Sequence, residues 1–393
     1  MNWIATPCPV CGHHWAVPFF EGGQAPLATL GWPQTAQEAQ TMPRYPLDFV
    51  RCPQCGHVWN RSFRYRDIPY QNQPNRMYNR GALWQGVLAE LAEQTLARLP
   101  TSPTVIEIGC GDGHFLAALA ARRPGRYLGF DPHAHVGTDG SFAFEARLFE
   151  PFADVPRYRP HLVVMRHVLE HFEQPATFIE ELAWAAAELE QKVLLLAEVP
   201  CIDHVFDSGR LADFFYEHPQ QFCRESFARL LAHGGQVLSI DETYGGEVLV
   251  GWLRLDVPLA ARERARASRR FAEQSQAARR AIAAQLDELA RSGKRIALWG
   301  GTGKAAAFMH HYGVDAERFP LVVDSDAAKV GTYVPGTGQR IQHRDVLKEQ
   351  PVDVLIIPSV WRARDIVAEM QRAGISAGRV LIEDGGRLVE WAG

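Results

Sequence analysis

Apolar residues fall into two alternating kinds of pattern between residues 82 and 256. Short β-branched runs indicate buried strands, whereas apolar positions at three- and four-residue spacing indicate amphipathic helices. Strands that alternate with helices favour a doubly wound parallel sheet, whose ligands bind beyond the carboxyl ends of the strands. The runs that predict strands are 105–108, 126–131, 162–165 and 192–200, and residues 82–99 predict a helix that leads into the first of them.

The rest of the chain adds a hairpin, one long helix and a second α/β unit. Residues 237–255 predict a β-hairpin around Gly245 and Gly246 that closes the sheet. Residues 260–294 are rich in Ala, Arg and Glu with an apolar stripe, which predicts a helical spacer that packs two domains together. Beyond this helix, residues 295–308 again follow the order strand, glycine turn and helix.

Composition narrows the class of protein. A chain of 393 residues, with 47% hydrophobic and 22% charged residues, is expected to form two or three globular domains. The net charge of -4 provides no basic field for nucleic acid, so DNA and RNA are not expected partners. The sequence has neither a signal peptide nor a run of transmembrane length, so we expect a cytoplasmic protein without a membrane partner, present as a monomer or weak dimer.

The stretch VIEIGCGDGHFLAALA, residues 105–120, carries the most specific chemistry. Gly109, Gly111 and Gly113 allow a sharp turn and a close approach of the backbone to a ligand, between a strand that ends near Glu107 and a helix. The pattern E-x-G-x-G-x-G resembles motif I of class I S-adenosylmethionine (SAM) methyltransferases; a structural turn or a site for another nucleotide are the alternatives. The residues expected to bind SAM are Glu107, Gly109, Gly111, Asp112, Gly113, His167 and Asp131, whose carboxylate is placed to accept the ribose hydroxyls.

Two CPxCG turns near the N-terminus predict a metal site. Cys8, Cys11, Cys52 and Cys55 would complete a tetrahedral Cys₄ site for Zn²⁺. Four thiolates leave no open coordination position, so we expect a structural zinc rather than a catalytic one. Redox dithiols or reactive thiols are the alternatives.

A Tyr-Glu-His run supplies candidate catalytic groups. Glu217 could orient His218 and raise its basicity, as proton abstraction near neutral pH requires, and Tyr216 lies beside them. A surface or helix-capping histidine is the alternative. Tyr78 lies in a polar, aromatic loop that either covers an active site or connects domains. In RHVLEHFEQP, which we expect to begin a helix, His167, Glu170 and His171 are expected to shape the cofactor floor rather than to perform acid–base chemistry.

The second glycine turn leaves two ligand classes open. Gly301, Gly303 and Lys304 nearly match a dinucleotide pattern, and the following strand ends in Asp324, so a nicotinamide cofactor is one possibility. Backbone N–H groups at a helix N-terminus, beside a lysine, would also suit a diphosphate.

The order of these motifs resembles the zinc-containing, SAM-dependent sugar C-methyltransferases of deoxysugar and antibiotic biosynthesis. Some members of that family are 3-C-methyltransferases of nucleotide-linked 4-keto hexoses. The resemblance implies a zinc-binding domain at 1–80, a class I SAM methyltransferase domain at 81–256, and a long linker helix with a Rossmann-like substrate-binding domain at 257–393. The matching stretches are CPVCG, YPLDFVRCPQCGHVWN, VIEIGCGDG, HVLEHFEQP, AEVP, GGTGKAAAF and VVDSDAAKVGTYVPGTGQRI.

The resemblance also assigns residues. It implies that the turn at 300–304 and Asp324 help to hold a nucleotide-sugar diphosphate, without a nicotinamide. Glu217 and His218 match the family's catalytic pair, whereas Phe215 stands where the family has a tyrosine, with Tyr216 next to it. A second departure is PSVWR at 358–362, in place of a Trp-Asn step.

These observations predict methyl transfer to carbon. A carbon beside a ketone becomes nucleophilic when a base removes its proton, and we expect His218, supported by Glu217, to be that base opposite the sulfonium. Positioning of the two reactants supplies the rest of the catalysis. The alternatives are an O- or N-methyltransferase on another small molecule, an NAD(P)-dependent oxidoreductase, and a non-catalytic module that binds SAM or a sugar.

Overall fold

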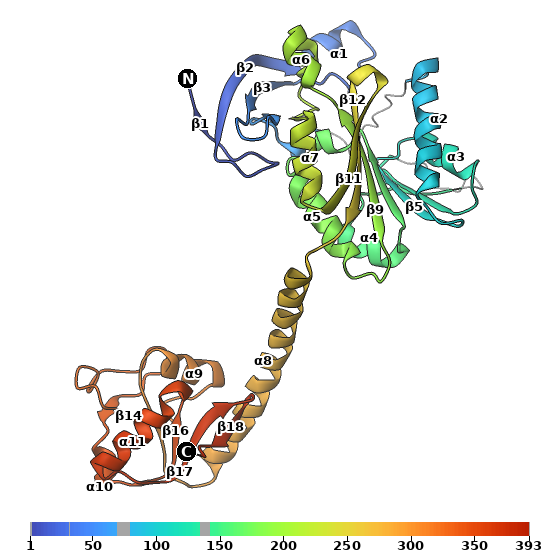
Figure 1. Cartoon of the computed structure of the whole chain (residues 1–393). Helices are drawn as coiled ribbons and strands as arrows, with labels where there is room; N and C mark the ends of the chain where they lie inside the picture. Colours follow the sequence, from blue (N-terminus) through green and yellow to red (C-terminus); the bar gives the residue numbers. More distant parts are fainter. Residues whose placement is uncertain (1, 31, 69–78, 134–141, 393) are drawn as a thin grey trace. The chain divides into compact units, whose positions relative to one another are not determined.

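The computed structural model describes residues 2–30, 32–68, 79–133 and 142–392 (Figure 1). The chain divides into two compact units, Met1–Leu259 and Ala260–Gly393. We describe each unit by itself. The division into three functional domains stays a prediction.

The first unit begins with a five-stranded antiparallel sheet in the order β1-β2-β3-β4-β10. Its last strand, β10, comes from the middle of the chain and pairs with β4, which joins the N-terminal segment to the stretch just after the predicted catalytic residues Glu217 and His218. The elements are β1 Ile4–Ala5, β2 Trp15–Pro26, α1 Ala36–Thr41, β3 Arg44–Arg51, β4 Val58–Asn60, η1 Tyr65–Asp67 and β10 Gln220–Gln221.

A seven-stranded sheet in the order β11-β12-β9-β8-β5-β6-β7 forms the rest of the first unit. Its strands are parallel except for β12, which runs antiparallel to both neighbours and forms the predicted hairpin with β11. This arrangement confirms the class I SAM methyltransferase fold. The strands are β5 Thr104–Ile108, β6 Arg126–Phe130, β7 Ala143–Glu145, β8 Leu162–Arg166, β9 Val193–Pro200, β11 Gly235–Thr243 and β12 Val248–Leu255.

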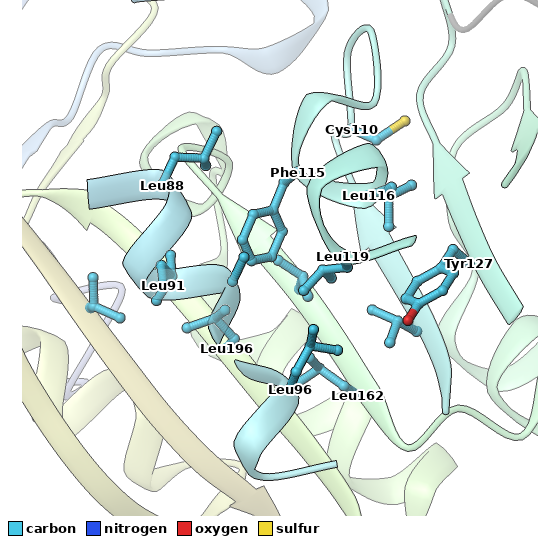
Figure 2. Close-up of a cluster of buried hydrophobic side chains, with 14 of the residues drawn as sticks. Leu88, Leu91, Leu96, Cys110, Phe115, Leu116, Leu119, Tyr127, Leu162 and Leu196 are labelled. Carbon is cyan, nitrogen blue, oxygen red and sulfur yellow. The ribbon is translucent and has the colours of Figure 1, made fainter. Parts of the chain in front are cut away.

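Helices cover both faces of this sheet: α2 and α3 lie on one side, and α4, α5 and α7 on the other (Figure 1). Figure 2 shows leucines of α2 and Phe115 and Leu119 of α3 gathered over Leu162 and Leu196 of the sheet, all of them buried. The helical segments are α2 Ala82–Ala97, α3 His114–Ala120, α4 Pro151–Tyr158, η2 Leu169–His171, α5 Pro175–Ala186, α6 Asp203–Ser208, η3 Leu211–Asp213, α7 Arg224–Ala232 and η4 Tyr244–Gly246.

The segment after β8 differs from the prediction. We expected a helix to begin within residues 166–171, but these residues form a turn and the short 3₁₀ helix η2, and α5 begins only at Pro175. Proline fits the first turn of a helix, where its missing N–H costs nothing, and therefore sets this start. The delay leaves His167, Glu170 and His171 on a loop at the carboxyl edge of the sheet.

The second unit holds a six-stranded sheet in the order β15-β14-β13-β16-β17-β18, parallel except for β18. Ile282 and Leu286 of α8 and the apolar side of α9 fill one face, and α10 and α11 fill the other. The elements are α8 Leu259–Arg291, β13 Ile296–Trp299, α9 Lys304–Tyr312, β14 Val322–Asp324, β15 Ile341–His343, α10 Val346–Glu349, β16 Val352–Ile357, η5 Val360–Arg362, α11 Ala363–Ala373, β17 Ala377–Asp384 and β18 Arg387–Glu390.

Candidate active site

The first glycine turn joins β5 to α3. Gly109, Gly111 and Gly113 have φ values of 67°, 51° and 74°, the left-handed region that favours glycine. An added Cβ at Gly109 would lie 2.5 Å from Val168, and one at Gly113 would lie 2.8 Å from Phe142 and Phe144. At Gly111 no atom of the described residues lies within 4 Å of that position. Packing therefore requires two of the glycines, and the third leaves an open surface that a ligand can approach.

Asp131 fixes this turn to the end of β6. Its carboxylate accepts hydrogen bonds from the backbone N–H of Gly111 at 3.2 Å and of His133 at 2.8 Å. The side chain of Asp112 is exposed on the turn. The carboxylate of Asp131 thus lies beside the open glycine, as a site for ribose hydroxyls requires.

Glu107 is buried beneath the turn. Its Oε2 atom has no hydrogen-bond partner among the described residues. Burial raises the pKa of Glu107 to about 8, an effect that the charge of Glu198 strengthens and that of Arg166 opposes. A buried carboxyl with an unsatisfied oxygen fits the ammonium group of SAM. The residues around this turn therefore suit the cofactor.

Charged residues at the ends of β8 and β9 form a network beside the turn. Arg166 pairs with Glu198 at 3.0 Å, and His167 Nε2 lies 2.8 Å from the same carboxylate. Burial opposes a charge on His167, but its contacts with Glu170 and Glu198 raise its pKa to about 9. Burial also opposes a charge on Glu198, yet Arg166 and His167 lower its pKa to about 2. His167 has a φ of 53°, which is rare for a residue with a side chain and is typical of functional sites.

His218 lies against aromatic side chains at the same edge of the sheet. Its ring centroid is 4.2 Å from that of Phe215 and 4.8 Å from that of His171. Burial, with smaller effects of His171 and His167, lowers the pKa of His218 well below its ordinary value. The structure therefore brings the predicted base close to residues of the predicted cofactor floor.

Glu217 does not hydrogen-bond to His218 through its carboxylate. Its Oε1 atom instead accepts from the backbone N–H groups of Thr29 at 2.8 Å and Leu30 at 3.1 Å. The backbone carbonyl of Glu217 accepts a hydrogen bond from His171 Nδ1 at 2.6 Å. Glu217 therefore joins the segment of His218 to the N-terminal region, rather than orienting the imidazole directly.

Tyr216 faces away from His218 and is fully buried. Its hydroxyl donates to Asp67 at 3.0 Å and accepts from the backbone N–H of Arg64 at 3.1 Å, and its ring stacks on Tyr45. Burial raises the pKa of Tyr216 to about 12. Tyr78, the other predicted tyrosine, lies outside the described residues.

Two aromatic residues near His167, Trp84 and Tyr244, were not predicted from the sequence. The Trp84 ring centroid lies 5.7 Å from that of His167 and 5.2 Å from that of Tyr244, whose hydroxyl accepts a hydrogen bond from Asn79. Tyr244 has a φ of 51° at the tip of the β11–β12 hairpin. The two glycines after it marked this tip in the sequence, but no local pattern indicated that Tyr244 would contact Trp84.

The four cysteines of the two CPxCG turns come together. Cys8 and Cys55 have sulfur atoms 3.7 Å apart, and Cys11 and Cys52 have theirs 3.6 Å apart. Bonds of about 2.3 Å in a tetrahedral Zn²⁺ site place sulfurs about 3.8 Å apart. The cluster therefore fits a zinc ion, and the predicted ligands are in contact.

In the second unit, the turn between β13 and α9 holds the predicted diphosphate residues. Gly303 has a φ of 61° and no atom within 4 Å of an added Cβ, whereas a Cβ on Gly301 would meet Ile341. The Lys304 ammonium lies 5.5 Å from the ring centroid of Trp361, which is 69% exposed. Asp324 is buried and pairs with Lys329 at 3.3 Å.

Two family models match the chain. Residues 79–237 match a methyltransferase domain, and residues 260–383 match a C-methyltransferase C-terminal domain. The chain is a SAM-dependent methyltransferase. The first match contains the glycine turn and His218, and the second contains the turn at 300–304.

Solved structures with similarity to this methyltransferase show low sequence identity over less than half of the chain. The [4+2]-cyclase SpnF shows 12% identity and a TM-score of 0.35, over 47% of this chain and 86% of its own. Magnesium protoporphyrin IX methyltransferase from Synechocystis PCC 6803, with bound SAH, shows 16% identity and a TM-score of 0.31, over 44% and 83%. A search of curated proteins gave no match.

No helix in the described part of the methyltransferase is both long and apolar enough to span a bilayer.

Proposed function

We propose that this methyltransferase adds a methyl group to carbon in a nucleotide-linked keto-deoxysugar. The match of residues 260–383 to a C-methyltransferase C-terminal domain supports transfer to carbon. The order of sequence motifs, which resembles that of sugar C-methyltransferases, supports the substrate class and a place in deoxysugar or antibiotic biosynthesis.

The first glycine turn would hold the cofactor. Gly111 leaves its backbone open, Asp131 lies beside it for the ribose, and Glu107 offers an unsatisfied oxygen to an ammonium group. When bound, SAM supplies an electrophilic methyl group on a sulfonium. The charged network of Arg166, His167 and Glu198 would fix the floor on which the methyl-bearing end rests.

His218 is the proposed base. Its imidazole lies at the carboxyl edge of the sheet, where ligands of this fold bind, against Phe215. His218 takes the proton from the carbon beside the ketone, and the electron pair of that C–H bond becomes available to the methyl group. Phe215 excludes water from one side of the imidazole, and Glu217 holds the backbone of this segment through Thr29 and Leu30.

The second unit would bind the nucleotide. Open backbone at Gly303, beside Lys304 at the start of α9, suits a diphosphate, and the exposed Trp361 ring suits stacking on a base. Asp324 would support the turn, because Lys329 already pairs with its carboxylate. This pairing argues against the dinucleotide alternative, in which an acidic residue binds the ribose hydroxyls.

The observation that carries the proposal is the position of His218 at the ligand-binding edge of a methyltransferase fold whose C-terminal unit matches C-methyltransferases. Its test is hydrogen exchange without methyl transfer. In D₂O, with S-adenosylhomocysteine in place of SAM, the enzyme should exchange the proton beside the ketone of a thymidine-diphosphate 4-keto sugar.

His218→Ala should abolish this exchange and keep its affinity for SAM, whereas His343→Ala, in the second unit, should exchange normally. Full hydrogen exchange by His218→Ala would contradict the role of His218 as the base. Binding of NAD without binding of SAM would contradict the proposed function itself.

A further inference from the structure

Three side chains beside the proposed base form a second cluster of metal-ligand type. Glu170, His171 and His218 each offer one ligand atom, and these atoms lie within 4.8 Å of one another. Among the described residues, this cluster and the four cysteines are the groups whose spacing suits a metal ion. The cluster includes two residues of η2, which follows β8, whereas the cysteines come from the two N-terminal CPxCG turns.

Glu170 is the unusual member. Its side chain is 1% exposed, and neither carboxylate oxygen accepts a hydrogen bond among the described residues. The His167 Nδ1 atom lies 3.4 Å from its Oε1 atom, too far for a strong hydrogen bond. A buried carboxylate is costly unless it is paired and hydrogen-bonded or binds a metal. Glu170 therefore has capacity for a further positive partner.

The imidazole of His171 is held in the tautomer that a metal requires. Its Nδ1 lies 2.6 Å from the carbonyl oxygen of Glu217, and a carbonyl can only accept, so Nδ1 carries the proton. In the neutral ring the lone pair is then on Nε2. A metal-bound histidine is typically oriented by such a bond from its other nitrogen to a carbonyl.

We infer that Glu170, His171 and His218 bind a divalent cation of the Zn²⁺ type, and that the bound cation switches off methyl transfer. Two imidazoles and one carboxylate are a zinc ligand set that leaves a fourth position open, whereas Mg²⁺ prefers oxygen ligands. Zinc bonds of about 2.0–2.2 Å place ligands about 3.4 Å apart, so small side-chain rotations complete the site.

His218 cannot bind the cation and act as the catalytic base at the same time. The proposed base uses one imidazole lone pair to take the proton from carbon, and a bound cation uses the same lone pair. When the cation is bound, His218 removes no proton from the substrate and the methyl group stays on SAM. The inhibition of methyl transfer by the cation rests on the proposed function, whereas the binding of the cation does not.

The binding test uses the full-length protein with its cysteine cluster already loaded with zinc. Zn²⁺ is titrated in by calorimetry, and bound metal is counted after removal of the excess. The wild type should hold a second zinc ion, and Glu170→Gln should lack it. Glu173→Gln is the matched control, because Glu173 accepts a hydrogen bond from the backbone of Tyr65 and does not belong to the cluster, and it should keep the second ion. A second ion that is absent from the wild type, or present in Glu170→Gln, would overturn the site.

The activity test compares each protein with its own rate in the absence of added metal. At ten times the Kd of the site, Zn²⁺ should lower wild-type turnover about tenfold, with recovery on dilution. Turnover of Glu170→Gln should change less than about twofold at the same concentration, as only the occupied site is inhibited. Activation by Zn²⁺, or equal inhibition of both proteins, would overturn the switch. If the wild type with zinc only in its cysteine cluster does not act on a keto sugar, the proposed function fails, and the count of bound zinc still decides the cation site.

Discussion

At the scale of single residues, the three glycines of the first turn show that one motif serves two purposes. All three have positive φ, but only Gly109 and Gly113 are pressed against neighbouring side chains, whereas Gly111 faces open space. The sequence predicted the turn because glycine spacing is a local signal. It did not predict this division, because Val168, Phe142 and Phe144 arrive from distant parts of the chain.

Alanine at two of these glycines should separate folding from cofactor binding. Gly109→Ala meets Val168 at 2.5 Å in addition to backbone strain, and should destabilise the protein by about 2–4 kcal/mol. Gly111→Ala carries only the strain, about 1–2 kcal/mol, but should lose most of its SAM affinity. Thermal unfolding and calorimetry with SAM check both. Normal SAM binding by Gly111→Ala would show that this glycine does not face the cofactor.

The carboxyl of Glu107 should make stability depend on pH. Its folded pKa of about 8 exceeds the ordinary value of 4.5, so the folded protein holds a proton that the unfolded chain has lost. The contribution is complete below about 4.5 and disappears as the pH rises through about 8.

In chemical unfolding without SAM, the wild type should therefore lose stability across this range relative to Glu107→Gln. Parallel pH profiles of the two proteins would contradict the raised pKa.

At the scale of elements, the predicted strands are present because each is a short apolar run, a signal contained within the segment itself. The 3₁₀ helix η2 and the two-residue strand β10 were not predicted. Both have partners far away in the sequence: His171 of η2 hydrogen-bonds to the carbonyl of Glu217, and β10 pairs with β4. The contacts of the Glu217 carboxylate were not predicted for the same reason, since residues 29 and 30 are remote in sequence.

Glu217 should prove to be a positioning residue. Glu217→Ala removes three hydrogen bonds to Thr29 and Leu30 and should lower stability by about 1–3 kcal/mol. Glu217→Gln keeps an oxygen that can accept from the two backbone N–H groups, and should recover most of the stability and turnover. Loss of turnover in Glu217→Gln, with normal stability, would indicate a direct catalytic role for the carboxylate.

At the scale of the whole molecule, the cysteine cluster and the proposed base belong to one connected unit. The N-terminal sheet takes β10 from the segment that follows His218, and Cys223, beyond β10, donates to the carbonyl of Cys55 at 3.5 Å. The Cys₄ cluster was predictable from two repeated motifs. Its connection to the catalytic segment was not, because strand pairing over this distance leaves no local pattern.

Removal of zinc should therefore impair catalysis from a distance. Cys52→Ser should lower the zinc content and reduce turnover, because the sheet that holds the segment of His218 loses its metal. SAM affinity should fall much less, since the glycine turn lies on β5 and α3. Metal analysis, turnover and SAM calorimetry on one preparation check this. Normal turnover by metal-free protein would show that the two sites are independent.

The central claim is transfer of a methyl group to carbon. Its most direct measurement is the NMR spectrum of the product formed from SAM with a ¹³C-labelled methyl group and a thymidine-diphosphate 4-keto sugar. We expect a methyl carbon bonded to the ring carbon beside the ketone. A methyl carbon bonded to oxygen or nitrogen would contradict it.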